Sequence, residues 1–145
     1  MLKKGRQSLY DIFTEISRLH YQLAHVLLDE IGIYPGQPPL LLLINEEEGQ
    51  SQRELADRLN ISPATLTVML GRMEKASLVK RKQDINDQRI SRVYLTHEGK
   101  EICTQAIKIT KKLKEECFAN LTMEEQVILR RLLLQVRDNL LNKIN

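Results

Sequence analysis

Residues 51–99 contain the feature that most restricts the fold, because they combine two short helix signatures with a basic β-hairpin signature. The first helix begins at a capping box formed by Ser51 and Glu54, in which each side chain satisfies a backbone N–H. Leu55, Ala56 and Leu59 give this helix an apolar edge. The segment therefore predicts a short helix packed on a core, immediately before a second one.

The second helix follows Asn60, a turn residue that tolerates left-handed backbone geometry. Ser62 caps it, and Pro63 occupies the first helical position, where a missing N–H has no cost. Four of its residues can face inward, namely Ala64, Leu66, Leu70 and Met73. Two capped helices separated by so short a turn predict a helix-turn-helix.

The second helix of such a motif enters the DNA major groove with its amino-terminal end. Threonine hydroxyls can bond base edges, and Val68 can pack on a thymine methyl group. We therefore assign DNA contact on this helix to Ser62, Ala64, Thr65, Thr67, Val68 and Arg72. The alternative is an ordinary solvated helix surface, and the helix by itself leaves both interpretations open.

Residues 78–83 and 90–95 have the alternating, β-branched pattern of strands, with the sequence DINDQR as the turn between them. The turn contains Asp84, Asp87 and Arg89, which predicts a projecting tip whose arginine is held by a neighbouring carboxylate. An arginine presented in this way suits the narrow, electronegative minor groove. Asp87, Arg89 and Arg92 complete the residues that we assign to DNA contact.

The distribution of charge supports this assignment. The whole chain has a net charge of only +3, but residues 51–100 contain ten Lys and Arg against six Asp and Glu. Residues 72–92 alone contain seven basic and three acidic side chains. Positive charge on the hairpin is the electrostatic pattern expected of a phosphate-binding element, although a solvated charged face is the alternative.

Helices are also predicted on both sides of this core. Apolar residues recur at helical spacing over about 8–30, and they are Ile12, Ile16, Leu19, Leu23 and Val26. Gly32 and Pro35 end that helix, and Pro38 and Pro39 are expected to delay the next one until residues 40–47.

After the hairpin, Thr96 caps a long helix with an apolar stripe of Ile102, Ala106, Ile109 and Leu113. Asn120 and Leu121 interrupt it, and Thr122 with Glu125 forms a second capping box for a helix that extends to about Asn142. The wide apolar face of this last helix consists of Ile128, Leu129, Leu132, Leu133, Val136, Leu140 and Leu141.

Taken together, these motifs resemble the MarR (multiple antibiotic resistance regulator) family. The matching segments are E-L-A at 54–56, R-x-E-K at 72–75, L-V-x-R at 78–81, D-x-R at 87–89 and L-T-x-E-G at 95–99. Two departures are Ser77, where the family usually has glycine, and Val68, near which many members have a basic residue.

The resemblance implies a mainly α fold with a small β-wing, in a single domain over residues 1–145. The winged helix core would occupy about 36–99, and residues 8–31 and 97–143 would form dimerisation helices. It further implies that Asp87 orients the wing and that Arg89 enters the minor groove. The expected function is a ligand-responsive repressor that binds double-stranded DNA as a homodimer at a pseudo-palindromic operator. A small-molecule effector would bind between the dimer helices and the core, near residues such as His20, Tyr34 and Pro38.

Other classes of protein are less consistent with the sequence. It contains no nucleophile elbow, P-loop, dinucleotide fingerprint or zinc-protease motif, so we expect no enzyme and no catalytic residues. The three histidines are scattered without metal-ligand spacing, so we expect neither a metal nor a cofactor. A winged-helix module that binds another protein instead of reading DNA is the alternative function.

The cysteines leave one further alternative open, a redox-sensing regulator. Cys103 and Cys117 lie on one predicted helix, separated by a rise of roughly 21 Å, and therefore cannot bond to each other within it. We expect both to be packing residues.

No apolar run reaches the roughly 18 residues of a membrane span, and the amino-terminal segment lacks the apolar core of a signal peptide. We therefore expect a cytoplasmic protein with no membrane partner.

Overall fold

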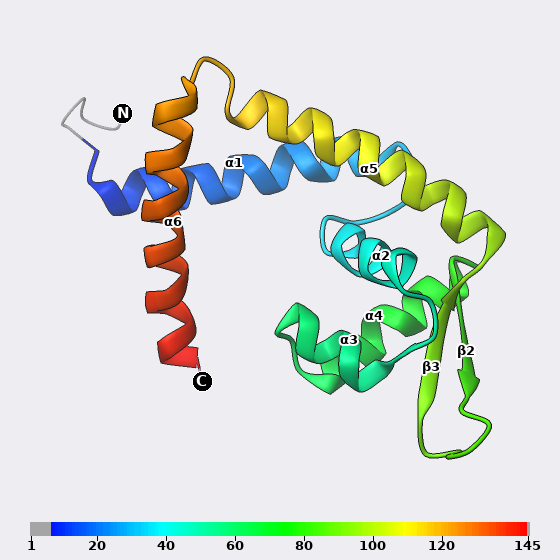
Figure 1. Cartoon of the computed structure of the whole chain (residues 1–145). Coiled ribbons are helices and arrows are strands. Elements are labelled where there is room, and N and C mark those ends of the chain that lie inside the picture. The colour runs from blue at the N-terminus through cyan, green and yellow to red at the C-terminus, as the bar shows by residue number, and fades with distance from the viewer. Residues whose placement is uncertain (1–6, 145) are drawn as a thin grey trace. The chain divides into compact units, whose positions relative to one another are not determined.

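Helices make up most of the chain, and a small antiparallel sheet lies among them (Figure 1). In chain order the elements are α1 (Leu9–Asp29), α2 (Gln37–Glu46), β1 (Gln50–Ser51), α3 (Gln52–Leu59), α4 (Pro63–Lys75), β2 (Val79–Gln83), β3 (Ser91–Leu95), α5 (His97–Cys117) and α6 (Met123–Ile144). The prediction of a mainly α fold with a small β-wing is confirmed.

The computed structural model describes residues 7–144 and divides into two units, with the boundary between Leu113 and Lys114. Residues 1–6, which belong to the segment where we expected no signal peptide, lie outside the described residues. Among the described residues, no helix combines the length and the hydropathy needed to cross a lipid bilayer.

Capping boxes fix the starts of several helices, because each one satisfies backbone N–H groups that have no partner within the helix. At α3 the backbone N–H of Ser51 donates to the Glu54 carboxylate, and the Glu54 N–H donates to the Ser51 hydroxyl. Thr122 and Glu125 make the same pair of bonds before α6. Both predicted capping boxes are therefore confirmed.

The predicted start of α2 is wrong. This helix begins at Gln37, so Pro38 and Pro39 lie within its first turn. The first turn of a helix has no internal acceptors for its N–H groups, and two prolines therefore remove no hydrogen bond there. The prolines begin this helix and do not delay it.

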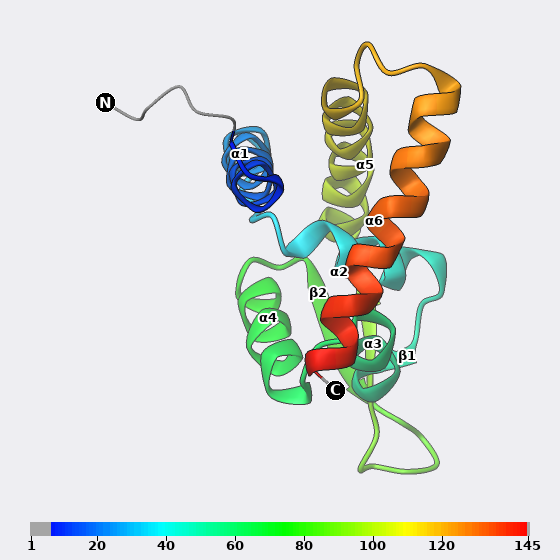
Figure 2. The same ribbon diagram turned by 90° about the vertical axis from the view of Figure 1, so that its left-hand side faces the viewer.

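The sheet has the strand order β1-β3-β2. In the β2–β3 hairpin Val79 pairs with Leu95 and Gln83 pairs with Ser91, and the loop between the strands extends beyond α3 and α4 (Figure 2). β1 pairs antiparallel with β3 and contains only two residues, which alternation of hydrophobicity could not identify. The sheet thus joins the hairpin to the segment before α3.

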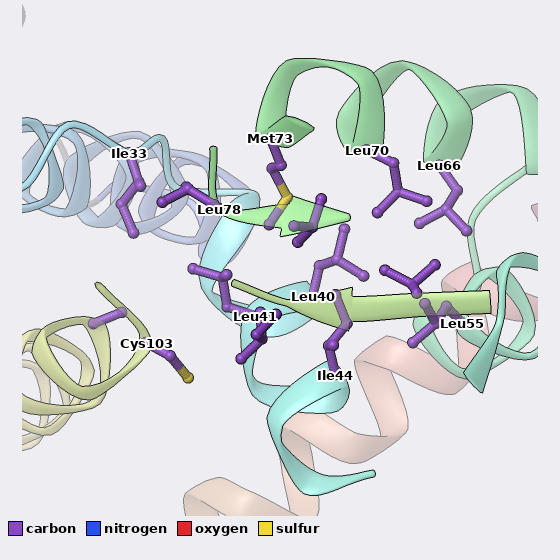
Figure 3. Close-up of a cluster of buried hydrophobic side chains, with 14 of the residues drawn as sticks. Ile33, Leu40, Leu41, Ile44, Leu55, Leu66, Leu70, Met73, Leu78 and Cys103 are labelled. Carbon is purple, nitrogen blue, oxygen red and sulfur yellow. The ribbon is translucent and has the colours of Figure 1, made fainter. Parts of the chain in front are cut away.

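One apolar core supports this arrangement in the first unit. Leu66, Leu70 and Met73 of α4 are completely buried and point toward the sheet (Figure 3). The other fully buried large side chains are Leu28, Leu40, Leu41, Ile44, Leu55, Val93 and Cys103. Every helix from α1 to α5 contributes at least one of these side chains, so the core fixes the helix-turn-helix against the hairpin.

In the second unit, α6 contains no buried residue. The residues that were predicted to form its apolar face are not covered. Ile128, Leu132 and Leu140, for example, are each about half exposed. Within its own unit, this helix therefore has an apolar surface that is in contact with solvent.

Candidate nucleic-acid interface

The face of α4 opposite its buried stripe is open to solvent. Thr65, Thr67, Val68 and Arg72 are exposed, as predicted, and 55% of the Val68 surface is accessible. Ala64 is also exposed, so its predicted inward position is wrong. Because a residue two positions away from Leu66 is rotated by about 200° around the helix axis, Ala64 points away from the core.

Hydroxyl groups near the start of α4 have partners within the helix. The hydroxyl oxygens of Ser62 and Thr65 lie 2.8 Å apart, and the Ser62 hydroxyl also accepts the Thr65 N–H. The Thr67 hydroxyl donates to the carbonyl oxygen of Pro63 at 2.9 Å. A hydroxyl that donates its hydrogen retains acceptor lone pairs, so Thr67 is set to accept hydrogen bonds from a ligand.

The tip of the wing is organised by Asp84. One of its carboxylate oxygens accepts the backbone N–H groups of Asn86 and Asp87, at 2.8 and 3.0 Å. The guanidinium of Arg92, together with these two N–H groups, holds the pKa of Asp84 below its ordinary value. The Asp84 carboxylate is therefore ionised, and it fixes the conformation of the turn.

Arg89 is held in the way the sequence predicted. Its Nε and Nη2 atoms donate to the two carboxylate oxygens of Asp87, each at 3.0 Å. This pairing lowers the pKa of Asp87 and raises the pKa of Arg89. The Arg89 side chain is nevertheless 90% exposed, so a charged group with a fixed orientation projects from the tip.

Arg92 is engaged inside the wing. Its Nε donates to Asp84, and its Nη1 donates to the carbonyl oxygen of Gly49 at 2.8 Å. Two of its three guanidinium nitrogens thus have partners in the protein, and its DNA contact stays a prediction. The bond to Gly49 links the hairpin to the segment before α3.

Arg81 makes a second link. It forms an ion pair with Glu74 of α4 and a 3.4 Å hydrogen bond with Gln52 of α3. Three arginines of the hairpin therefore each have a carboxylate partner, and Lys82 lies 5.6 Å from the ring centre of Tyr94. Counting charges along the sequence overstated the free positive charge, because it could not detect these pairs.

Sequence reasoning missed one buried polar group beneath this region, Gln50. Its amide nitrogen donates to the carbonyl oxygens of Leu43 and Glu47, and its amide oxygen accepts from Arg58. These bonds satisfy carbonyl groups at the end of α2, where a helix has no internal donors. A glutamine directly before a capping serine was the only signal available, and it is a weak one.

The two cysteines differ in environment. Cys103 is buried in the core, and this burial raises the pKa of its thiol. Its predicted packing role is therefore confirmed. Cys117 is exposed, so the same prediction is wrong for this residue, which lies in the last turn of α5.

The residues considered for an effector site lie in different environments. Pro38 is buried in α2, whereas His20 on α1 and Tyr34 in the following turn are exposed. The ring of Tyr34 lies 6.1 Å from that of His25. The effector and its binding site stay predictions.

Comparison with known proteins adds independent evidence. The sequence model of the MarR family matches residues 33–91, which extend from the turn before α2 to the start of β3. The chain is 33% identical over 114 residues to the uncharacterised HTH-type transcriptional regulator YdgJ of Bacillus subtilis, an alignment that covers 79% of this chain and 67% of YdgJ. It is 38% identical over 90 residues to the transcriptional regulator HosA of Escherichia coli, covering 62% of this chain and 67% of HosA.

Among solved structures, a mutant MarR from E. coli complexed with operator DNA matches with a TM-score of 0.74 and 28% identity. This match covers 90% of the present chain and 99% of the other. These relatives are transcriptional regulators and not enzymes. With the helix-turn-helix and the arginine-bearing wing described above, the matches show that the chain belongs to the MarR family of winged helix-turn-helix transcriptional regulators.

Proposed function

We propose that this regulator represses transcription by binding a pseudo-palindromic operator as a homodimer. In this proposal α4 reads base edges in the major groove, while Arg89 enters the adjacent minor groove. The observation that carries it is the pairing of Asp87 with Arg89, which presents a guanidinium outside the protein in a fixed orientation. A wing that docks another protein has no need of such a group.

The exposed face of α4 is suited to direct reading of bases. Thr65 and Thr67 offer hydroxyl groups, and Val68 offers an apolar surface for the methyl group of thymine. Arg72, two turns farther along the helix, has the reach for a phosphate or a guanine edge. We therefore propose that sequence preference arises mainly from the first two turns of α4.

The dimer is proposed from apolar surface that the chain leaves exposed. Ile128, Leu132, Val136 and Leu140 follow one another at intervals of one helical turn on α6, and each is between 38% and 54% exposed. The predicted apolar face of α1 is exposed as well, at Ile12, Ile16, Leu19, Leu23 and Val26. Contiguous apolar surface of this kind marks an interaction site, and a second copy with the same two helices is the proposed occupant.

A two-fold dimer presents two copies of α4 to half-sites about one helical turn of DNA apart. This spacing is the reason for proposing a pseudo-palindromic operator. Because chromosomal DNA is the proposed partner, the proposed location is the compartment that contains it, the cytoplasm of a bacterial cell. We further propose that a small-molecule effector changes the distance between the two copies of α4 and thereby regulates DNA binding.

The test begins by selecting bound duplexes from a random pool and measuring affinity for the enriched operator. Arg89→Ala is expected to weaken binding by roughly 1–3 kcal/mol while leaving the fold intact. Gln88→Ala changes an exposed neighbour in the same turn and serves as the matched control. Unchanged affinity of the Arg89 variant at moderate salt would contradict the role of the wing. Failure of the pool to enrich any sequence would instead favour the protein-docking alternative.

A further inference from the structure

A cleft lies between the wing and the first turn of α3, within the first unit. It is lined by Ser51, Gln52, Arg53, Arg89, Ile90 and Ser91 and has a volume of about 520 Å³. The lining contains two arginines and no acidic residue. Two cationic side chains therefore line a cleft beside the part of the protein that is proposed to contact DNA.

The two arginines approach the cleft from different elements. Arg89 belongs to the wing, and its bonds to Asp87 occupy Nε and Nη2, so its Nη1 edge keeps two free N–H groups. Arg53 belongs to the first turn of α3 and is exposed. Within residues 7–144 its side chain takes part in none of the ion pairs.

The remaining polar groups of the lining are mostly donors. The Ser51 hydroxyl accepts the Glu54 N–H, which leaves its own hydrogen free to donate. The Gln52 amide oxygen accepts from Arg81, so the amide N–H₂ of Gln52 is available. The two nearby carboxylates are already committed, since Glu54 accepts the Ser51 N–H and Asp87 accepts from Arg89. A site rich in free donors and cations matches an anion.

We propose that this cleft holds one phosphodiester group of the DNA backbone, bound by Arg53 from the α3 side and by the Nη1 edge of Arg89 from the wing side. The inference rests on the proposed function and adds a specific partner group to it. A phosphate bordering the minor groove lies next to an arginine that enters that groove, so one guanidinium can serve both contacts. Arg53 is then a positioning contact that sets the register of the duplex and carries no sequence information.

The first experiment measures the affinity of the full chain for two labelled duplexes of different sequence over a series of KCl concentrations. Arg53→Gln removes one cation that contacts phosphate, so the slope of log K against log[KCl] should become shallower by about 0.9 per protomer. The loss of affinity should be the same for both duplexes. Arg18→Gln makes the same change of charge at an exposed position on α1 and should leave affinity and slope unchanged.

The second experiment tests whether the two arginines share one phosphate. Arg89→Gln is measured alone and together with Arg53→Gln, which completes a double-mutant cycle. If both side chains hold the same group, the second substitution should cost less than the first, and the two losses should not multiply. Independent losses that multiply would overturn the shared site.

The outcomes separate this proposal from the proposed function. If Arg53→Gln keeps the wild-type slope while Arg89→Gln weakens binding, the cleft proposal is overturned and DNA binding by the wing stands. If the unmodified protein binds neither duplex at low salt, the proposed function itself is overturned.

Discussion

Ser77 connects α4 to β2 in a backbone conformation that side chains rarely adopt. Its φ is +60°, and the other described non-glycine residues with positive φ are Asn60 and Asn120. Asparagine tolerates this region better than serine, because its side chain can bond locally. The carbonyl group of Ser77 also accepts the hydroxyl of Thr96, which keeps the turn in place. At a position where the family usually has glycine, this chain therefore has a serine in the left-handed conformation.

Ser77→Gly is expected to raise the free energy of unfolding by about 0.5–1 kcal/mol, because relief of an unfavourable left-handed conformation outweighs the added freedom of the unfolded chain. Chemical denaturation followed by circular dichroism measures this change. Asn60→Gly is the matched control and should give a smaller gain. An equal or larger gain at Asn60 would show that the strain at Ser77 is absorbed elsewhere.

Local sequence was sufficient to predict many single residues. Capping pairs, the turn at Asn60 and the pairing of Asp87 with Arg89 involve residues at most three positions apart, so their chemistry can be recognised without the fold. Arg92 and Gly49, which are in contact, are 43 positions apart in the sequence, and Arg81 and Gln52 are 29 positions apart. Only the folded chain brings such groups together, which explains why these contacts of Arg81 and Arg92 within the protein were not predicted.

At the scale of elements, the start of α5 lies directly against the beginning of the wing. A Cβ atom at Gly99 would overlap the carbonyl oxygen of Leu78, and the same carbonyl accepts the N–H of Thr96. This close approach explains why L-T-x-E-G has a glycine at its end: helix and strand can meet here only without a side chain. The motif was visible in the sequence, but the backbone that it contacts was not.

Gly99→Ala is therefore expected to destabilise the protein by about 1–3 kcal/mol, since rigid backbone must move to accommodate the new methyl group. Gly71→Ala is the matched control, because nothing lies within 4 Å of the corresponding Cβ position in α4. That substitution should stabilise the protein by roughly 0.5–1 kcal/mol through helix propensity alone. Thermal unfolding of both variants measures these changes in stability. If the two substitutions changed the stability equally, the packing explanation would be contradicted.

At the scale of the whole molecule, the sequence predicted the helices outside the winged core, but it could not predict which of their faces stay uncovered. In α5 the predicted stripe packs into the core at Ala106 and Leu113. In α6, which was also predicted to have an apolar face, no residue is buried. The sequence predicted an apolar face on each helix, but it could not show which of the two faces is buried.

Leu132→Lys places a charge within the exposed stripe of α6 and is expected to convert the proposed dimer into a monomer. Sedimentation equilibrium should then give a mass near 16.9 kDa for the variant and about twice that for the unmodified chain. Gln135→Lys adds the same charge at an exposed polar position of the same helix and should leave the dimer intact. A monomeric wild-type protein would contradict the dimer directly.

The ion pairs that Arg81 and Arg92 of the wing form have a consequence for the time that the protein spends bound to the wrong DNA. Residence on random sequence depends on how many backbone charges a protein neutralises, and arginines already paired with Asp84 and Glu74 contribute little to that number. Such a wing is expected to release random sequence quickly and so to shorten each unproductive encounter during a genome-wide search. The carboxylates that reduce the free positive charge of the hairpin are therefore expected to speed discovery of the correct site.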